Sequence, residues 1–255
     1  NFCDEWNETN NEMTKKFIVG YVLNVQTPYD HITVKIDGYW YYTEPNGNFQ
    51  TYVGPGSHSV EVQTPVSLEP GSRGVFVQWS DGNSSNPRTI FMNNNLSLTA
   101  EYMTQYYLTI NRNPSYIGEA TGEGWYNNGT IATATCTSPV PWGANTRYVF
   151  TNWTGDAFET STTLHLIMDG PKTVTANYKT QFYINITSSH GVPTPSQWAD
   201  KGSSLTVEVE SPTETITNQT RWRCTGFSVD HADIQEGTSY KFSYVQEPHE
   251  IEFYW

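Results

Sequence analysis

Apolar and polar positions alternate with a period of two along much of the chain. The clearest case is segment 205–210, where Leu205, Val207 and Val209 are separated by polar residues, and segment 131–137 has the same pattern. Such alternation is typical of a strand with one buried face. Turn-forming residues divide these segments at 45–47, 81–82, 127–129, 169–171 and 201–202. No segment has a convincing helical period, so the sequence predicts an all-β fold.

One motif recurs three times along the chain. It reads Arg, two residues, Phe or Cys, two residues, Trp or Phe, and its copies begin at Arg73, Arg147 and Arg221, a constant spacing of 74 residues. Segment 98–110 returns as 174–186, and its first part returns at 251–255. Such periods are the signature of repeat architectures. We therefore expect three tandem β-sandwich-like modules of about 75 to 90 residues that form a rod. Their limits are a polar tail 1–15 followed by modules 16–104, 105–180 and 181–255.

Three segments carry a resemblance to a known family. Gly124–Gly129, Tyr148–Gly155 and Met168–Tyr178 resemble the divergent internalin B-repeat family, also called bacterial repeat domains. The second copy is similar along its whole length, the first over 52–102, and the third more loosely. The resemblance implies small β modules of secreted and surface-anchored proteins of bacteria and archaea, which serve as stalk, adhesion or assembly parts. It supplies no catalytic residues.

The recurring Arg and aromatic residues have two interpretations, a binding surface or the packing of each copy. We favour packing, because repeat units keep the residues that hold each copy and its neighbour together. The predicted repeat core consists of Arg73, Trp79, Arg147, Trp153, Arg221 and Phe227.

A loop in the third copy differs from its counterparts. It contains Asp230, His231 and Asp233, followed by Glu236. Carboxylates and an imidazole are ligands for calcium or a transition metal. The spacing matches no EF-hand or paired-histidine motif, so a solvated acidic turn is the simpler interpretation and the metal stays undetermined.

The sequence offers little support for catalysis. It contains no nucleophile elbow, no phosphate-binding glycine loop and no metallohydrolase motif, and its six histidines are scattered over the copies. We expect a protein that is not an enzyme and that needs no cofactor.

Composition limits the kinds of partner that the protein can have and the cellular compartment in which it can work. The 255 residues carry a formal charge of −13, which excludes a protein that coats nucleic acid. No apolar run is long enough for a membrane span. The chain opens at Asn1 without a signal-like segment, as expected of a processed, mature product.

Cys3, Cys136 and Cys224 are too few for a disulfide framework. Cys224 takes the place of Phe76 and Phe150 in the motif, and Cys136 shares a strand face with small apolar residues, so buried free thiols are expected. A bridge from Cys3 to either, or between two chains, is the alternative.

Seven Asn-x-Ser/Thr sequons predict N-glycosylation and an extracellular location. They lie at Asn7, Asn83, Asn95, Asn128, Asn152, Asn185 and Asn218. Few charges and many hydroxyl and amide groups also fit an archaeal surface protein that works hot or in acid, where such a surface changes little in charge.

These observations predict a secreted, glycosylated structural protein: a filament subunit, a surface-layer-associated subunit or an adhesin stalk. We expect its partners to be copies of itself or other surface proteins, joined through strand edges and the N-terminal segment. The alternative is a carbohydrate-binding module, in which Tyr39–Tyr42 and Trp125–Tyr126 stack on sugar rings. A further alternative is an accessory part of a larger secreted complex.

Overall fold

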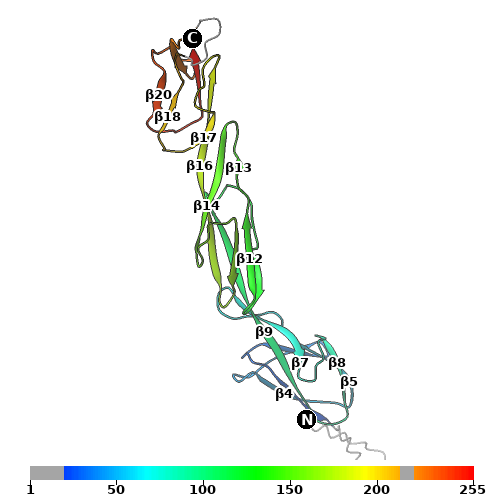
Figure 1. Cartoon of the computed structure of the whole chain (residues 1–255). Coiled ribbons are helices and arrows are strands. Elements are labelled where there is room, and N and C mark those ends of the chain that lie inside the picture. Colours follow the sequence, from blue (N-terminus) through cyan, green and yellow to red (C-terminus); the bar gives the residue numbers. More distant parts are fainter. Residues whose placement is uncertain (1–19, 213–220) are drawn as a thin grey trace, which may run out of the picture. The chain divides into compact units, whose positions relative to one another are not determined.

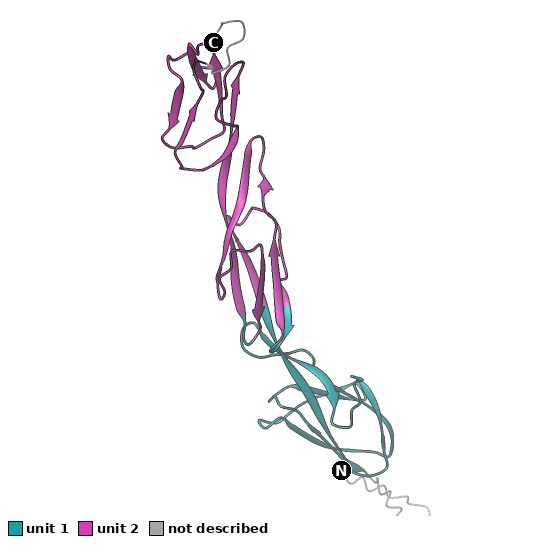
Figure 2. Cartoon of the chain, viewed as in Figure 1, with its two compact units in different colours: residues 1–107, 125–129, 169–171 teal, residues 108–124, 130–168, 172–255 magenta. Residues whose placement is uncertain are grey.

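The computed structural model describes residues 20–212 and 221–255, and its regular structure in these ranges is entirely β. The predicted all-β class is confirmed. The chain separates into two compact units (Figure 2). Unit 1 contains the chain up to residue 107 together with 125–129 and 169–171, and unit 2 contains 108–124, 130–168 and 172–255. The three-module rod stays a prediction.

Unit 1 is built from two sheets. The first contains β1 (Tyr21–Gln26), β4 (Asn48–Val53), β6 (Val66–Ser67), β7 (Ser72–Trp79) and the first part of β9 (Leu96–Asn113), and β11 (Gly124–Asn127) pairs with β9. The second has the order β3 (Tyr39–Tyr42), β2 (Thr33–Ile36), β5 (Gly56–Val62) and β8 (Arg88–Met92).

The core of unit 1 is drawn from both sheets, as in a β-sandwich. Leu23 and Leu98 come from the first sheet, Val34 and Val60 from the second, and Trp79 is completely buried among them. The inward residues alternate with polar ones, so the sequence pattern and the burial agree.

The recurring motif contains a β-bulge. Phe76 and Trp79 are three positions apart, and an odd spacing places residues of a regular strand on opposite faces. The register of β7 against β9 shifts between Phe76 and Gln78, which returns both rings to the core side, 5.4 Å apart. A shift at the same point of the second copy, between Phe150 and Asn152, places Phe150 5.7 Å from Trp153.

Unit 2, magenta in Figure 2, contains the last part of β9 and the remaining strands, several of which are labelled in Figure 1. They are β10 (Ala120–Thr121), β12 (Ile131–Cys136), β13 (Val140–Pro141), β14 (Thr146–Gly155), β15 (Thr163–Ile167), β16 (Lys172–Ser188), β17 (Gln197–Asp200), β18 (Leu205–Glu208), β19 (Gly226–Val229), β20 (Ser239–Phe242) and β21 (His249–Tyr254).

The 17-residue strand β16 joins the second and third copies within unit 2. Its first half pairs with β14 and in parallel with β9, and its second half pairs with β17 and in parallel with β21. No separate linker therefore lies between these two copies. A further core forms where this sheet meets the β18–β20 pair, with Val207, Phe227 and Ile251 buried.

The cysteines only partly follow the prediction. Cys224 is buried as expected. Cys136 is half-buried, because it lies in the last position of β12, where its partner across the strands is Ala120 of the two-residue strand β10. Both are free thiols. Cys3 lies outside the described residues.

Candidate functional site

Arg73 of the first copy lies against a tryptophan of the second. Its guanidinium carbon is 4.2 Å from the ring centroid of Trp125, and its Nε donates to Oε1 of Gln105 at 2.9 Å. The ring of Tyr107 meets Trp125 edge-on, with centroids 5.2 Å apart. Arg73 and Trp125 are both half-buried. The planar guanidinium suits this position, because it can stack on a ring and donate in its own plane.

Polar groups extend this contact along the hairpin. Gln105 receives the Arg73 bond on its oxygen and donates through Nε2 to Oδ1 of Asn127 at 2.8 Å. The next residue, Asn128, donates its backbone NH to the carbonyl of Thr104 at 2.9 Å. Both hydrogen-bonding ends of the Gln105 amide are thus used.

The same arrangement recurs in unit 2 at Arg147. Its guanidinium carbon is again 4.2 Å from a ring centroid, that of Trp198, and its Nε donates to Gln181 at 2.8 Å. Tyr183 lies 5.2 Å from Trp198, as Tyr107 does from Trp125. We call each of these two arrangements a junction, consisting of Arg, Gln, Trp and Tyr.

The second junction also contains an ion pair, between Lys179 and Asp200. Asp200 takes the place of Asn127, and its two carboxylate oxygens accept from Lys179 and Gln181, each at 2.7 Å. The hydrogen bonds from Lys179 and then Gln181 lower the pKa of Asp200 below its usual value, against the opposing effect of burial. An open groove runs beside these groups, lined by Trp198, Asp200 and Ser203 among others.

The predicted repeat core separates into two classes of residue. The aromatic positions lie in the core, since Trp79 and Trp153 are fully buried and Phe227 is 4% exposed. Arg73 and Arg147 instead reach a tryptophan of the following copy. Arg221 is exposed, and among the described residues it has no hydrogen bond, ion pair or ring contact.

The sequence interpretation missed the partners of these arginines. Gln105 and Gln181 recur at an offset of 76 and Trp125 and Trp198 at an offset of 73, so the repeat period could have identified them. From the sequence alone, Trp125 is a candidate for stacking on a sugar ring. Its ring contacts Arg73 and Tyr107, and these contacts cover part of the surface that a sugar would need.

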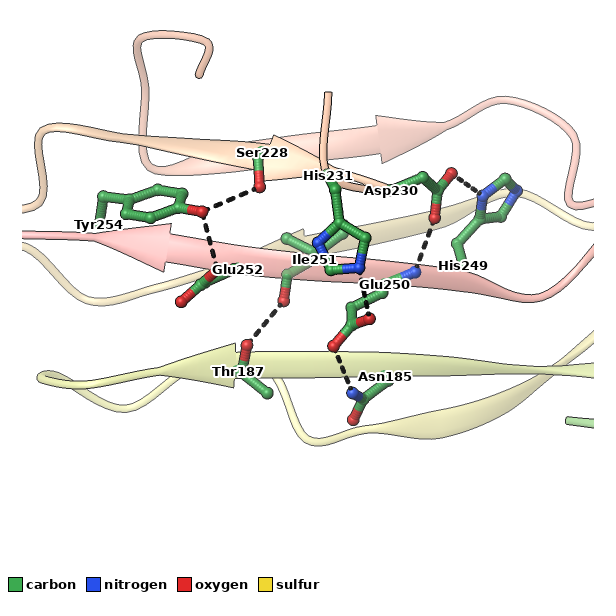
Figure 3. A network of polar contacts seen from close by, with 10 residues as sticks. All are labelled: Asn185, Thr187, Ser228, Asp230, His231, His249, Glu250, Ile251, Glu252 and Tyr254. Atoms are coloured by element: carbon green, nitrogen blue, oxygen red, sulfur yellow. Dashed lines mark hydrogen bonds and ion pairs between the residues drawn. The ribbon is translucent and has the colours of Figure 1, made fainter. Parts of the chain in front are cut away.

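Two of the three metal candidates, Asp230 and His231, have different partners (Figure 3), and the third, Asp233, is exposed. Asp230 accepts the backbone NH of Glu250 at 2.9 Å and lies 2.7 Å from Nδ1 of His249, while His231 lies 3.3 Å from Glu250. Glu250 also accepts from Asn185 at 3.0 Å. Among residues 20–212 and 221–255, no three His, Cys, Asp or Glu side chains gather as metal ligands. These contacts fasten β21 to β16 and to the turn after β19.

The sequons fall into two groups by environment. Asn83, Asn95 and Asn128 are exposed, whereas Asn152 and Asn185 are half-buried. Asn95 accepts the backbone NH of Val22 through Oδ1 at 2.9 Å, and this bond does not use its amide nitrogen. Asn185 uses its amide nitrogen to donate to Glu250 within the sheet. Asn7 and Asn218 lie outside the described residues.

Comparison with known families agrees with the repeat pattern. Residues 108–182 match the divergent InlB B-repeat domain. This confirms the predicted resemblance for the second copy, and it indicates a surface-associated repeat domain of a cell-surface or extracellular protein. No curated protein matches the chain. In the described ranges no helix is long and apolar enough to cross a membrane.

Proposed function

We propose that the chain is a non-enzymatic, glycosylated structural protein of the cell surface, a subunit of an extracellular filament or surface layer or an adhesin stalk. The observation that supports this most is the junction. Two successive copies hold the next one through the same Arg, Gln, Trp and Tyr contacts, at matching distances. The feature that recurs is therefore a contact between successive copies.

The joint between the second and third copies is suited to a mechanical role. Strand β16 passes from one copy to the next without interruption, and the Arg147 contacts brace the hairpin that follows it. Bending at this point would break the ladder of β16 with β14 and β17 and the stack on Trp198 together. A stalk or filament needs this resistance.

An edge strand in unit 1 supports assembly through strand edges. β3 is the last strand on one side of its sheet, where it pairs with β2 alone among the described strands, and all four of its residues are exposed. The unpaired NH and CO groups on the outer side of an edge strand are a template for another strand. We propose that the N-terminal segment 1–15, which lies outside the described residues, joins a neighbouring copy in this way.

The test is electron microscopy of the native protein, together with its intact mass. The proposal expects ordered polymers and a mass above 28.9 kDa from glycans. Deletion of residues 1–15 should abolish the polymers. Isolated molecules at the unmodified mass would contradict the proposal, and polymers that persist after the deletion would remove the role of the segment.

A second candidate, carbohydrate binding, is favoured by the edge strand β3. Trp40 and Tyr42 are 59% and 66% exposed and share one face of the strand, and Lys35 lies 4.7 Å above the Trp40 ring. Flat aromatic faces beside hydrogen-bonding groups suit sugar rings. Binding on a glycan array that is lost in Trp40→Ala and Tyr42→Ala would support this candidate, and a blank array would contradict it. Co-purification of a catalytic chain would favour the accessory alternative.

A further inference from the structure

A tight turn in unit 1 places an aspartate against a histidine. Asp37 lies between β2 and β3 with a φ of 48°, and Gly38 follows it with a φ of 87°. Aspartate followed by glycine is a pair that two-residue hairpin turns favour. The Asp37 carboxylate reaches β5, where Oδ2 lies 2.6 Å from Nδ1 of His58 and Oδ1 accepts the backbone NH of Ser59 at 2.8 Å. Both carboxylate oxygens are therefore used.

The second ring nitrogen of His58 also faces an acceptor. Nε2 lies 3.0 Å from the carbonyl oxygen of Gly54, just before β5. A carbonyl oxygen can only accept, so the single NH of a neutral imidazole belongs on Nε2. The contact between Nδ1 and the Asp37 carboxylate then needs one further proton. The pair is complete only when it holds one proton more than a separate carboxylate and a neutral imidazole.

The surroundings of the pair favour this proton on the ring. Burial raises the pKa of Asp37, but the hydrogen bonds from His58 and from the NH of Ser59 outweigh it, so that the pKa lies below its ordinary value. The side chain of His58 is 18% exposed and that of Asp37 is 43% exposed, so solvent screens the contact in part.

The other charged side chains on the strands beside β5 have partners of their own. Arg88 of β8 donates to both carboxylate oxygens of Asp81, and Lys35 of β2 lies 3.7 Å from Glu61. The strand beyond β2 carries only aromatic residues, and segment 54–55 before β5 carries no titratable side chain. The titration of the pair therefore depends on its own two members.

The same arrangement occurs at an unrelated position in unit 2. Asp230 has a φ of 53°, its Oδ2 lies 2.7 Å from Nδ1 of His249, and its Oδ1 accepts the NH of Glu250 at 2.9 Å (Figure 3). In both units the aspartate contacts a histidine and the residue that follows it. Among the described residues, Nε2 of His249 has no hydrogen-bond partner. The need for an extra proton is therefore specific to the pair in unit 1.

We propose that the contact between Asp37 and His58 makes unit 1 most stable in mildly acidic surroundings, because the folded pair holds a proton that the unfolded chain releases at neutral pH. This inference goes beyond the proposed structural function, since it names the condition that favours unit 1. Above the ordinary pKa of an imidazole, about 6.5, the folded chain holds more protons than the unfolded one, so stability falls as the pH rises. Below the ordinary pKa of a carboxyl group, about 3.9, the lowered pKa of Asp37 makes stability fall as the pH falls.

The test is urea denaturation of the whole chain from about pH 5 to about pH 8, with resonances of unit 1 followed by NMR. The midpoint of unit 1 should fall by about 0.5 M over this range, as expected for one charge-assisted hydrogen bond that solvent partly screens. His58→Gln should remove this fall, because an amide does not titrate. A midpoint that stays constant in the unsubstituted protein, or a fall that persists in His58→Gln, would overturn the inference.

A matched control substitutes the other histidine of unit 1. His31 is exposed and has a φ of 53°, which asparagine tolerates. His31→Asn should leave the fall unchanged, and an equal loss of the fall in both variants would indicate a general charge effect and contradict the inference.

Nitrogen NMR of the unsubstituted protein measures the proton directly and does not depend on how the variants fold. At about pH 7 the ring of His58 should carry an NH on both nitrogens, whereas most His31 rings should carry one. A His58 ring with a single NH would overturn the inference. The proposed structural function would stand after that result, because the measurement does not involve polymers.

Discussion

Replacing Arg147 by alanine removes a hydrogen bond and a ring stack from unit 2 at once. The bond from Nε to Gln181 is 2.8 Å long, and such a bond contributes about 1 kcal/mol. The half-buried stack on Trp198 adds about 1 kcal/mol. We therefore expect Arg147→Ala to lower the free energy of unfolding of unit 2 by about 2 kcal/mol.

The assay is urea denaturation of the whole chain, with resonances of unit 2 followed by NMR. With a slope of about 2 kcal/mol/M, the midpoint of unit 2 should fall by about 1 M. The unfolding of unit 1 should not change, because Arg147 and Trp198 both lie in unit 2. Arg223→Ala is the matched control, since Arg223 is exposed and lacks contacts with other described side chains.

A double-mutant cycle isolates the stack from other effects of the substitution. Arg147→Ala, Trp198→Ala and the double variant should give a coupling free energy of about 1 kcal/mol. A coupling below about 0.3 kcal/mol, the usual error of additivity, would refute the idea that the junction stabilises the joint.

Three further predictions address the core, the response to acid and the glycans. Trp153→Ala should cost about 3 to 5 kcal/mol in denaturant unfolding, because the ring is fully buried, and a loss under about 1 kcal/mol would contradict its core role. Lys179 holds the pKa of Asp200 below its unfolded value. The stability from Asp200 is therefore present above that value and is lost as the pH falls through the folded pKa. In Asp200→Asn, the melting temperature of unit 2 should fall less at acid pH than it does in the unsubstituted protein. An unchanged pH dependence would contradict a stabilising role of this contact. Glycopeptide mass spectrometry should find a glycan on exposed Asn128 and none on Asn185, whose amide is bonded within the sheet; the reverse pattern would contradict the assignment.

The local sequence pattern was sufficient to predict the fold class and the positions of the buried aromatic residues. Alternation of period two predicted β12 and β18, since a strand with one buried face must place every second side chain inward. Repetition at 74 residues identified Trp79 and Trp153 as recurring positions, and both are fully buried. The three-residue step between Phe150 and Trp153 contains the bulge, although only the ladder with β16 displays it.

Tertiary structure decided what the arginines do. Arg73 and Trp125 are 52 residues apart, so no local pattern relates them, and the chain brings them together only when β7 and β11 both pair with β9. The loop around Asp230 was ambiguous for the same reason, because its partner His249 comes from a strand placed beside it by the sheet. Which residues alternate and which recur can be read from the amino-acid sequence alone. Which recurring residues meet depended on strand pairing over long separations, and that pairing is set by the packing of whole sheets.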